Sequence, residues 1–243
     1  YESMQTTKGI VLRVIRYSDS RIIVTLFTEH YGMLSAGVRL VRGGRSGGRS
    51  ALWQVLNVVE MSVDYRPANE LQKISDVSIA VPWMELPYNP VKASISMFLG
   101  DFLYHSLRGE GENPALFSFL YNSLHWLDEA DGNVANFHLL LMIRMTRFLG
   151  IWPSMAGYGR NMVYDMKNAC FASVLPVHGQ YLEAKYARWI PLLLEMDYSR
   201  MHRLRMTREE RWHMLEVLLQ YYHLHVPSFG ELQSVEILRE LFS

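Results

Sequence analysis

Apolar and polar residues alternate with a period of two along most of residues 8–81, and this alternation predicts short β-strands. Three such runs come first, separated by the turn-forming stretches 17–20 and 29–32. Two more runs follow at about 52–65 and 70–80. In the first run, the sets predicted to point to opposite faces are Ile10, Leu12 and Val14 against Val11, Arg13 and Ile15.

Five short strands with one long connection after the third predict a small closed barrel, because closure removes the exposed edges that such strands otherwise leave. The five-stranded oligonucleotide-binding (OB) barrel has this strand count. We therefore expect a barrel of this kind in the first part of the chain.

The second part of the chain has apolar residues at the spacing of α-helices. Asn89-Pro90 and Asn113-Pro114 each provide an N-cap residue followed by a proline at the first helical position. A third helix ends near Gly150, and the capping-box pair Thr207 and Glu210 begins a later one. This pattern predicts that the second part is all-helical.

Prolines at positions 82, 87 and 90 mark the junction between the two patterns. We therefore predict an α+β chain, with an N-terminal five-stranded OB barrel in residues 1–82 and an all-helical domain in residues 83–243. Within the helical domain, an irregular insertion is expected at about 151–180.

Composition excludes several classes of protein. Among the 243 residues, 49% are apolar and 20% are charged, which excludes general disorder. No apolar run reaches the roughly 18 residues of a membrane helix, so we expect no membrane segment. The N-terminus is polar through Lys8 without a signal peptide, and we expect a cytoplasmic protein. The single cysteine, Cys170, excludes an internal disulfide and a zinc site built on two or four thiolates.

Charge is distributed unevenly, although the chain is neutral overall with 24 basic and 24 acidic residues. Residues 8–49 contain eight Lys or Arg but only Asp19 and Glu29 as acids, which gives a net charge of +6. Such a concentration of arginine indicates a polyanionic partner, because arginine pairs with phosphate through two hydrogen bonds and stacks on bases. The alternative is that these arginines protect strand edges in water.

Aromatic residues near the predicted turns add to this basic region. Proteins that bind single strands combine a basic groove with aromatic platforms, and each stacked base is worth about 1–3 kcal/mol. Tyr17, Tyr31 and Trp53 are the candidates, although we expect Trp53 to be buried in the barrel.

Residues 43–50, Gly-Gly-Arg-Ser-Gly-Gly-Arg-Ser, superficially match the phosphate-binding loop of nucleotide hydrolases. That loop leads into a helix, whereas the sequence that follows here predicts a strand. No metal-binding carboxylate lies between Glu29 and Glu60, which disfavours a nucleotidyl or phosphoryl transferase. We interpret the segment as a glycine-rich loop that presents Arg45 and Arg49 to a nucleic-acid backbone, or as an ordinary surface loop.

Other patterns that carry chemistry are weak. The nine histidines include no HExxH motif, and no GxSxG motif or Ser-His-Asp arrangement is indicated. We therefore predict no catalytic residue, no metal and no cofactor. A second basic run at 200–211 either extends a DNA track, receives an acidic tail from a partner or is a solvated helix start.

Eight stretches are informative through their order and spacing along nearly the whole chain. In the predicted barrel they are 8–12, 17–20, 23–28 and 32–35, and in the helical part they are 102–108, 113–120, 147–150 and 227–232. Together they resemble the RecO family of bacterial recombination mediators. The pattern is most similar to family members of the Bacteroides group.

The resemblance implies an OB barrel followed by a helical domain, in a non-catalytic protein that binds single- and double-stranded DNA and anneals complementary strands. It implies single-stranded-DNA-binding protein (SSB) and RecR as partners and, through them, the loading of RecA at gaps. Many family members carry a four-cysteine zinc module after the third long helix. Because residues 151–180 retain only Cys170, we predict no zinc in this chain.

The basic barrel and the resemblance lead to one hypothesis, in which the barrel neutralises DNA phosphates and so lowers the repulsion between two strands. The predicted DNA-binding residues are Lys8, Arg16, Arg21, Arg39, Arg42, Arg45 and Arg49. In the helical domain, Arg144 and Arg147 are predicted to hold the acidic, apolar tail of SSB. The alternative is a protein-interaction scaffold whose basic barrel binds an acidic partner.

Overall fold

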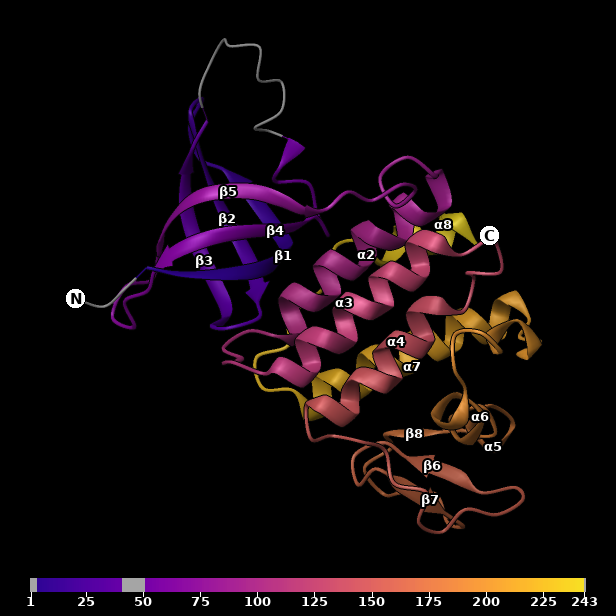
Figure 1. Ribbon diagram of the computed structural model, residues 1–243. Helices are drawn as coiled ribbons and strands as arrows, with labels where there is room; N and C mark the ends of the chain where they lie inside the picture. Colours follow the sequence, from indigo (N-terminus) through magenta and orange to yellow (C-terminus); the bar gives the residue numbers. More distant parts are fainter. Residues whose placement is uncertain (1–3, 41–50, 243) are drawn as a thin grey trace. The chain divides into compact units, whose positions relative to one another are not determined.

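The computed structural model of the protein describes residues 4–40 and 51–242 (Figure 1). Its packing divides the chain into two compact units. The first unit runs to Glu129 and includes Glu231–Leu238, and the second takes Ala130–Gly230 and the chain from Arg239 onward. The domain boundary predicted at residues 82 and 83 stays a prediction.

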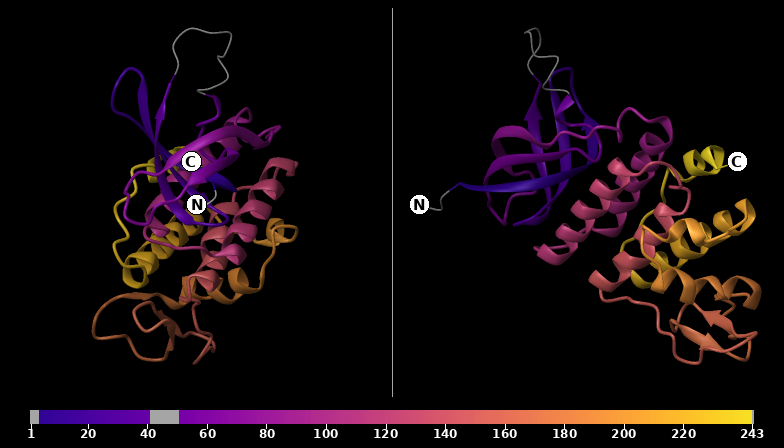
Figure 2. Two further views of the ribbon diagram at one scale, coloured as in Figure 1. Left: turned by 60° about the vertical axis from the view of Figure 1, so that its left-hand side comes forward. Right: turned by 45° about the vertical axis from the view of Figure 1, so that its right-hand side comes forward.

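The first unit is built on a five-stranded antiparallel sheet in the order β3-β2-β1-β4-β5 (Figures 1 and 2). The strands are β1 (Gln5–Arg16), β2 (Arg21–Thr28), β3 (Gly32–Arg39), β4 (Val58–Asp64) and β5 (Lys73–Val81). The central strand β1 pairs with β2 on one side and with β4 on the other. The five strands expected from the sequence are therefore present, and the fold is OB-like.

The two end strands of this sheet meet at one point. Ala36 in β3 forms a single parallel bridge with Gln72, whose backbone N–H donates to the carbonyl of Ser35 at 2.8 Å. The side chain of Gln72 is hydrogen-bonded to the backbone of Arg66 and Asn69. The residue before β5 is thus bridged to β3, whereas β5 itself, although close to β3, is not paired with it in the described residues. The expected full closure of the barrel was therefore wrong for the described residues.

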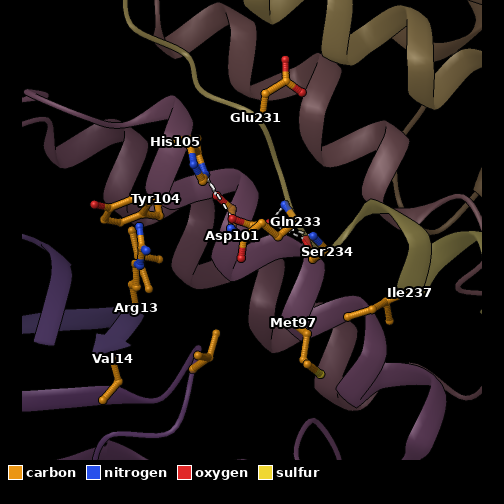
Figure 3. A pocket seen from close by; sticks show the side chains of 12 residues that line it. Arg13, Val14, Met97, Asp101, Tyr104, His105, Glu231, Gln233, Ser234 and Ile237 are labelled. Atoms are coloured by element: carbon orange, nitrogen blue, oxygen red, sulfur yellow. Dashed lines mark hydrogen bonds and ion pairs between the residues drawn. The ribbon is translucent and has the colours of Figure 1, made fainter. Parts of the chain in front are cut away.

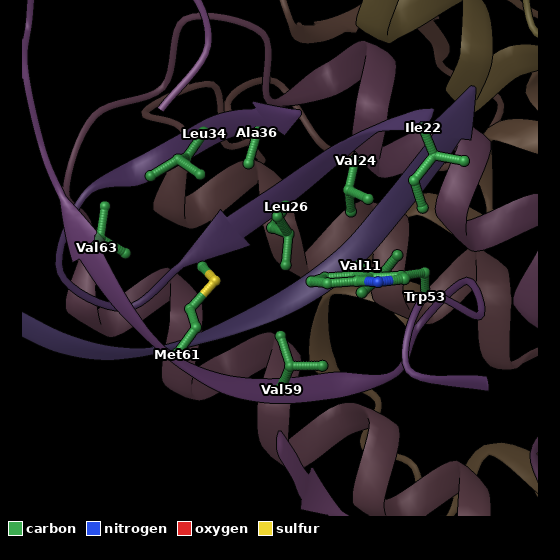
Figure 4. Close-up of a cluster of buried hydrophobic side chains, with 10 residues drawn as sticks. All are labelled: Val11, Ile22, Val24, Leu26, Leu34, Ala36, Trp53, Val59, Met61 and Val63. Atoms are coloured by element: carbon green, nitrogen blue, oxygen red, sulfur yellow. The ribbon is translucent and has the colours of Figure 1, made fainter. Parts of the chain in front are cut away.

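The interior of the sheet is filled by alternate side chains of the strands (Figure 4). The buried cluster consists of Val11, Ile22, Val24, Leu26, Leu34, Ala36, Trp53, Val59, Met61 and Val63. Trp53 is only 6% exposed, so the expectation that it is buried is confirmed. Apolar burial of this kind is the main term that stabilises the sheet.

Strand β1 departs from strict alternation at its middle. A β-bulge lies between Val11 and Arg13, at Leu12. Val11 and Val14 are three residues apart, yet both pack in the interior. Arg13 is exposed on the outer face, opposite Thr25 of β2. The face predicted for Val14 relative to Val11 was therefore wrong, because the bulge adds one residue to the alternation.

Helices α2 (Pro90–Ser106) and α3 (Pro114–Glu129) pack in the same unit and cover part of the outer face of the sheet. Asn89 caps α2 by accepting two backbone hydrogen bonds, as its Asn-Pro sequence predicts. Phe27 of β2 contacts Phe117 of α3, with ring centroids 6.2 Å apart. These helices thus cover the outer face of the sheet around Phe27.

Asp128, near the end of α3, holds the proline-rich connection between β5 and α2. Its carboxylate accepts hydrogen bonds from the backbone N–H groups of Met84, Glu85 and Leu86 at 3.1, 2.8 and 2.9 Å. Burial alone raises the pKa of this carboxyl, but the three hydrogen bonds and the charge of Lys92 bring the pKa below its ordinary value. The connection is therefore fixed by a charged group.

The second unit combines helices with one small sheet. Its elements are α4 (Phe137–Phe148), β6 (Val163–Asp165), β7 (Cys170–Ala172), β8 (Tyr181–Leu182), α5 (Ala184–Ala187), α6 (Trp189–Glu195), the 3₁₀ helix η1 (Met201–Arg203) and α7 (Arg208–His225). The last helix, α8 (Val235–Leu241), belongs to the first unit up to Leu238. The three strands form a sheet in the order β7-β6-β8. The segment predicted as irregular at about 151–180 therefore contains regular structure, in strands too short for a period-two pattern to show.

Candidate nucleic-acid interface

Outside the area that the helices cover, the outer surface of β1, β2 and β3 is exposed in rows that the strand register defines. In order, the rows are Arg13–Thr25–Ser35, Ile15–Ile23–Gly37 and Arg21–Arg39. We call this surface the β1–β3 face. It places apolar side chains between two basic rows, on the strands that OB folds use to bind oligonucleotides.

Arg21 and Arg39 lie directly opposite each other on β2 and β3, and both are exposed. Like charges at opposed positions of a sheet repel each other and reduce its stability. Among residues 4–40 and 51–242, neither arginine has an acidic partner within ion-pair distance. An anion bound between them would offset the repulsion.

Arg16 is at the same end of the sheet but on its other face. It pairs with Ile22, whose side chain lies in the interior, so Arg16 extends from the interior side at the rim. Tyr17, the next residue, is 52% exposed. The structure therefore brings Arg16, Arg21 and Arg39 to one end of the sheet, on two faces.

Lys8 is separate from these arginines. It precedes Arg16 by eight residues of extended strand, a distance of about 26 Å. It lies opposite Glu60 of β4, and its ammonium group is 5.5 Å from the ring centroid of Tyr121 in α3. Its surroundings already supply an acidic neighbour and an aromatic ring, unlike those of Arg21 and Arg39.

Three of the predicted DNA-binding residues lie outside the described residues. They are Arg42, Arg45 and Arg49, together with the glycine-rich loop at 43–50. Their predicted roles stay predictions.

Of the three aromatic candidates, only Tyr17 is well exposed. Trp53 is in the interior cluster, and Tyr31 is stacked on Tyr65 with ring centroids 4.5 Å apart. The hydroxyl of Tyr31 donates to Gln5 Oε1 at 3.3 Å, and burial together with Tyr65 raises the pKa of Tyr31. Tyr17 is therefore the available platform for a stacked base at this end of the sheet.

A second aromatic residue, Tyr104, lies next to this face, and no sequence pattern indicates it. Tyr104 of α2 lies near two exposed arginines, with the guanidinium carbon of Arg13 4.5 Å and that of Arg108 5.1 Å from its ring centroid. Arg13 is one of the basic residues of 8–49, but no local signal links it to Tyr104, which is 91 positions away in the chain. Tyr104 therefore extends the candidate interface onto a helix.

Arg144 and Arg147 are both in α4, one half-buried and the other exposed. They are three residues apart and so lie on neighbouring positions of one helix face. The guanidinium carbon of Arg147 is 4.4 Å from the ring centroid of Trp152. These positions allow both arginines to contact a common partner.

In the segment 151–180, where we predict no zinc, the carboxylate of Asp165 holds the chain in place. Asp165 accepts hydrogen bonds from the backbone N–H and side-chain amide of Asn168 at 2.9 and 2.8 Å, and Nε2 of His178 is 2.9 Å from Oδ1. Burial raises the pKa of Asp165, but these contacts bring it below its ordinary value. No group of three or more potential metal ligands occurs in the described parts of the chain.

The fold and the β1–β3 face define a class of protein, namely one with an OB-like domain followed by helices. Residues 4–83 match the family profile described as "Recombination protein O N terminal". Residues 87–232 match "Recombination protein O C terminal". The chain therefore belongs to the RecO family of DNA repair proteins, and the resemblance noted from the sequence is confirmed. Within the described residues, no helix is both long and apolar enough to cross a membrane.

Relatives agree with this assignment over their full length. The chain is 43% identical over 240 residues to "DNA repair protein RecO" of Phocaeicola vulgatus, which covers 99% of this chain and 100% of the relative. It is 40% identical to the protein of the same name from Bacteroides fragilis, over 98% and 99% of the two chains. A Flavobacterium psychrophilum relative is 30% identical over 98% of both.

Proposed function

We propose that the β1–β3 face binds the phosphate backbone of DNA. The observation that carries this proposal is the opposed pair Arg21 and Arg39, exposed and without an acidic partner among the described residues. Guanidinium groups bind phosphate with two parallel hydrogen bonds, and the apolar row of Ile15 and Ile23 beside them suits unstacked bases. Neutralised phosphates account for affinity that does not depend on base sequence.

The same chemistry supports a function as a recombination mediator in the cytoplasm. A surface that neutralises the phosphates of two strands lowers their mutual repulsion, and this favours annealing of complementary strands. In this proposal the chain is not an enzyme and helps RecA to load onto SSB-coated single strands. Its membership of a DNA repair family supports this function.

The proposed partners are DNA, SSB and RecR, and indirectly RecA. For SSB, we assign the acidic tail to Arg144 and Arg147, whose charges suit a peptide carboxylate. An Arg144→Ala/Arg147→Ala variant is then expected to bind a peptide of that tail more weakly and to bind free DNA normally. Unchanged affinity for the peptide would remove both residues from this role.

Annealing of complementary oligonucleotides coated with SSB is the decisive test. An Arg21→Ala/Arg39→Ala variant should anneal them about tenfold more slowly, because two phosphate contacts are lost. An Arg160→Ala/Lys167→Ala variant, which removes two exposed cations from the second unit, should behave as wild type. If the opposed arginines instead serve an acidic protein, the first variant will anneal normally and an unrelated oligonucleotide will not compete with that partner.

A further inference from the structure

A pocket of 370 Å³ adjoins Arg13 of the β1–β3 face (Figure 3). Its walls come from β1, the segment before β4, α2 and the chain at 231–237, all within the first unit. Pockets that bind small molecules typically have volumes of about 300–1,000 Å³. The pocket is therefore large enough to receive part of a ligand, and the proposed DNA-binding function leaves it unused.

One edge of the pocket is basic and aromatic. Arg13 and Tyr104 both line it, and the guanidinium carbon of Arg13 is 4.5 Å from the ring centroid of Tyr104. Arg108 approaches the same ring at 5.1 Å. Two positive groups beside one ring repel each other, and within the described ranges neither has an acidic ion-pair partner. This edge is therefore suited to an anion.

The opposite part of the pocket is apolar, with Met97 and Ile237 in its wall. Met97 is 56% exposed, so its side chain is accessible to a ligand in the pocket. The flat, apolar faces of a nucleobase match such a wall in a way that a free phosphate does not.

Acidic groups in the pocket do not oppose an anion at the Arg13 edge. Oδ2 of Asp101 accepts hydrogen bonds from the backbone N–H groups of Gln233 and Ser234 at 2.9 and 3.0 Å, and from the Ser234 hydroxyl at 2.7 Å. Its Oδ1 is 3.1 Å from Nδ1 of His105. In Figure 3, the carboxylate of Glu231 points away from Arg13. The negative charges are therefore turned towards other donors or away.

The pocket is continuous with the β1–β3 face. Arg13 is in register with Thr25, which follows Arg21 by four residues along β2, a distance of about 13 Å. A single DNA strand bound at Arg21 and Arg39 can therefore reach Arg13 within a few nucleotides. A rigid duplex has no free base to place in a pocket, whereas a single strand has one at every position.

We propose that this pocket is a nucleotide subsite for single-stranded DNA, in which Arg13 and Arg108 bind a phosphate and the base enters beside Tyr104 towards Met97. The subsite rests on the proposed DNA-binding function and deepens it, because it makes the interface selective for strands with unpaired bases. Stacking on an aromatic ring tolerates every base, so no sequence preference is expected.

The test compares two oligonucleotides of equal length and charge, a thymidine 12-mer and a 12-mer without bases. Wild type should bind the thymidine strand more tightly. Tyr104→Leu should weaken that binding about 5- to 150-fold, the equivalent of one stacked base, and should leave the abasic strand unaffected. Tyr104→Phe keeps the ring and should behave as wild type.

The arginines have a different signature. Arg13→Gln and Arg108→Gln should each weaken binding of both strands. Together they should reduce the log–log salt slope by about 0.7, the value for one phosphate, whereas Tyr104→Leu should leave the slope unchanged. Both arginines are exposed, so these variants are expected to fold even if Tyr104→Leu does not. Arg160→Gln, an exposed arginine in the second unit, is the matched control.

The outcomes separate this proposal from the one on which it rests. If wild type binds neither 12-mer, the DNA-binding function is overturned and the subsite with it. If Arg21→Ala/Arg39→Ala weakens binding while the Tyr104 and Arg13 variants match wild type on both strands, the subsite alone is overturned. A loss confined to the thymidine strand in Tyr104→Leu supports it.

Discussion

Single residues of this chain are held in states that reduce stability on their own. Arg21 and Arg39 repel each other across two strands, and a bound phosphate would relieve that repulsion. His138 of α4 is only 1% exposed, and its ring is stacked 5.7 Å from that of Phe242. Burial, with a smaller effect of the charge of Arg211, lowers the pKa of His138 to about 3. The imidazole is therefore neutral in the folded chain at neutral pH.

His138 is predicted to set part of the acid limit of stability. Its pKa is about 3 in the folded chain and 6.5 when unperturbed, so its contribution is complete above pH 6.5 and is lost as the pH falls towards 3. The slope is about 1.4 kcal/mol per pH unit. Between about pH 6.5 and 5, the free energy of unfolding should fall about 2 kcal/mol more in wild type than in His138→Gln. Urea denaturation measures this difference, and parallel pH profiles would contradict it.

At the scale of elements, helix starts could be predicted from neighbouring residues, whereas features that depend on strand pairing could not. Helices α2 and α3 begin at Pro90 and Pro114, where the Asn-Pro pairs predict them. Thr207 and Glu210 form both hydrogen bonds of the capping box at α7. In contrast, the bulge in β1 and the strands β6, β7 and β8 depend on pairing with distant residues. A sequence window does not contain such pairings, so the alternation in β1 and the segment 151–180 were misinterpreted.

Gly100 tests how closely α2 packs on β1. A methyl group at this position would overlap the side chain of Val55 and would lie 3.2 Å from the carbonyl oxygen of Leu12. Helix propensity favours alanine by about 1 kcal/mol, but overpacking costs about 1–3 kcal/mol. We therefore predict that Gly100→Ala is neutral to about 2 kcal/mol less stable, by urea denaturation.

The control for this variant is Gly111→Ala. The methyl group at Gly111 meets no described atom within 4 Å, so this variant should be at least as stable as wild type. A Gly100→Ala protein that gains the full helix-propensity benefit of about 1 kcal/mol would show that α2 and β1 are not in close contact.

For the whole molecule, the charge pattern indicates which segment is basic but not which of its residues lie side by side. The net charge of +6 belongs to residues 8–49, and three arginines of this segment, Arg13, Arg21 and Arg39, share the β1–β3 face. The pairing of Arg21 with Arg39 follows from strand register, which charge counting does not contain. The approach of Tyr104 to Arg13 depends on how α2 packs, and no motif encodes it.

Salt dependence measures how many phosphates the chain neutralises. The six arginines predicted to bind DNA, taken as one phosphate contact each, predict a log–log slope of about −4 for single-stranded DNA, at about −0.7 per phosphate. Arg21→Ala/Arg39→Ala should reduce the slope to about −2.8. Fluorescence anisotropy of a labelled oligonucleotide between about 50 and 300 mM salt gives both values. The Arg160→Ala/Lys167→Ala control should keep the wild-type slope. If Arg21→Ala/Arg39→Ala also keeps it, Arg21 and Arg39 do not contact phosphates.

The bulge at Leu12 makes the length of β1 as important as its composition. Leu12 itself is 2% exposed, and the next residue, Arg13, belongs to the exposed β1–β3 face. Deleting or adding a single residue there would turn one half of the strand inside out relative to the other. A mutation that changes no side chain, only the count of residues between Val11 and Val14, is therefore expected to move an arginine from solvent to the interior. The turn at 17–20 has no such constraint and should accept a change of length far more readily.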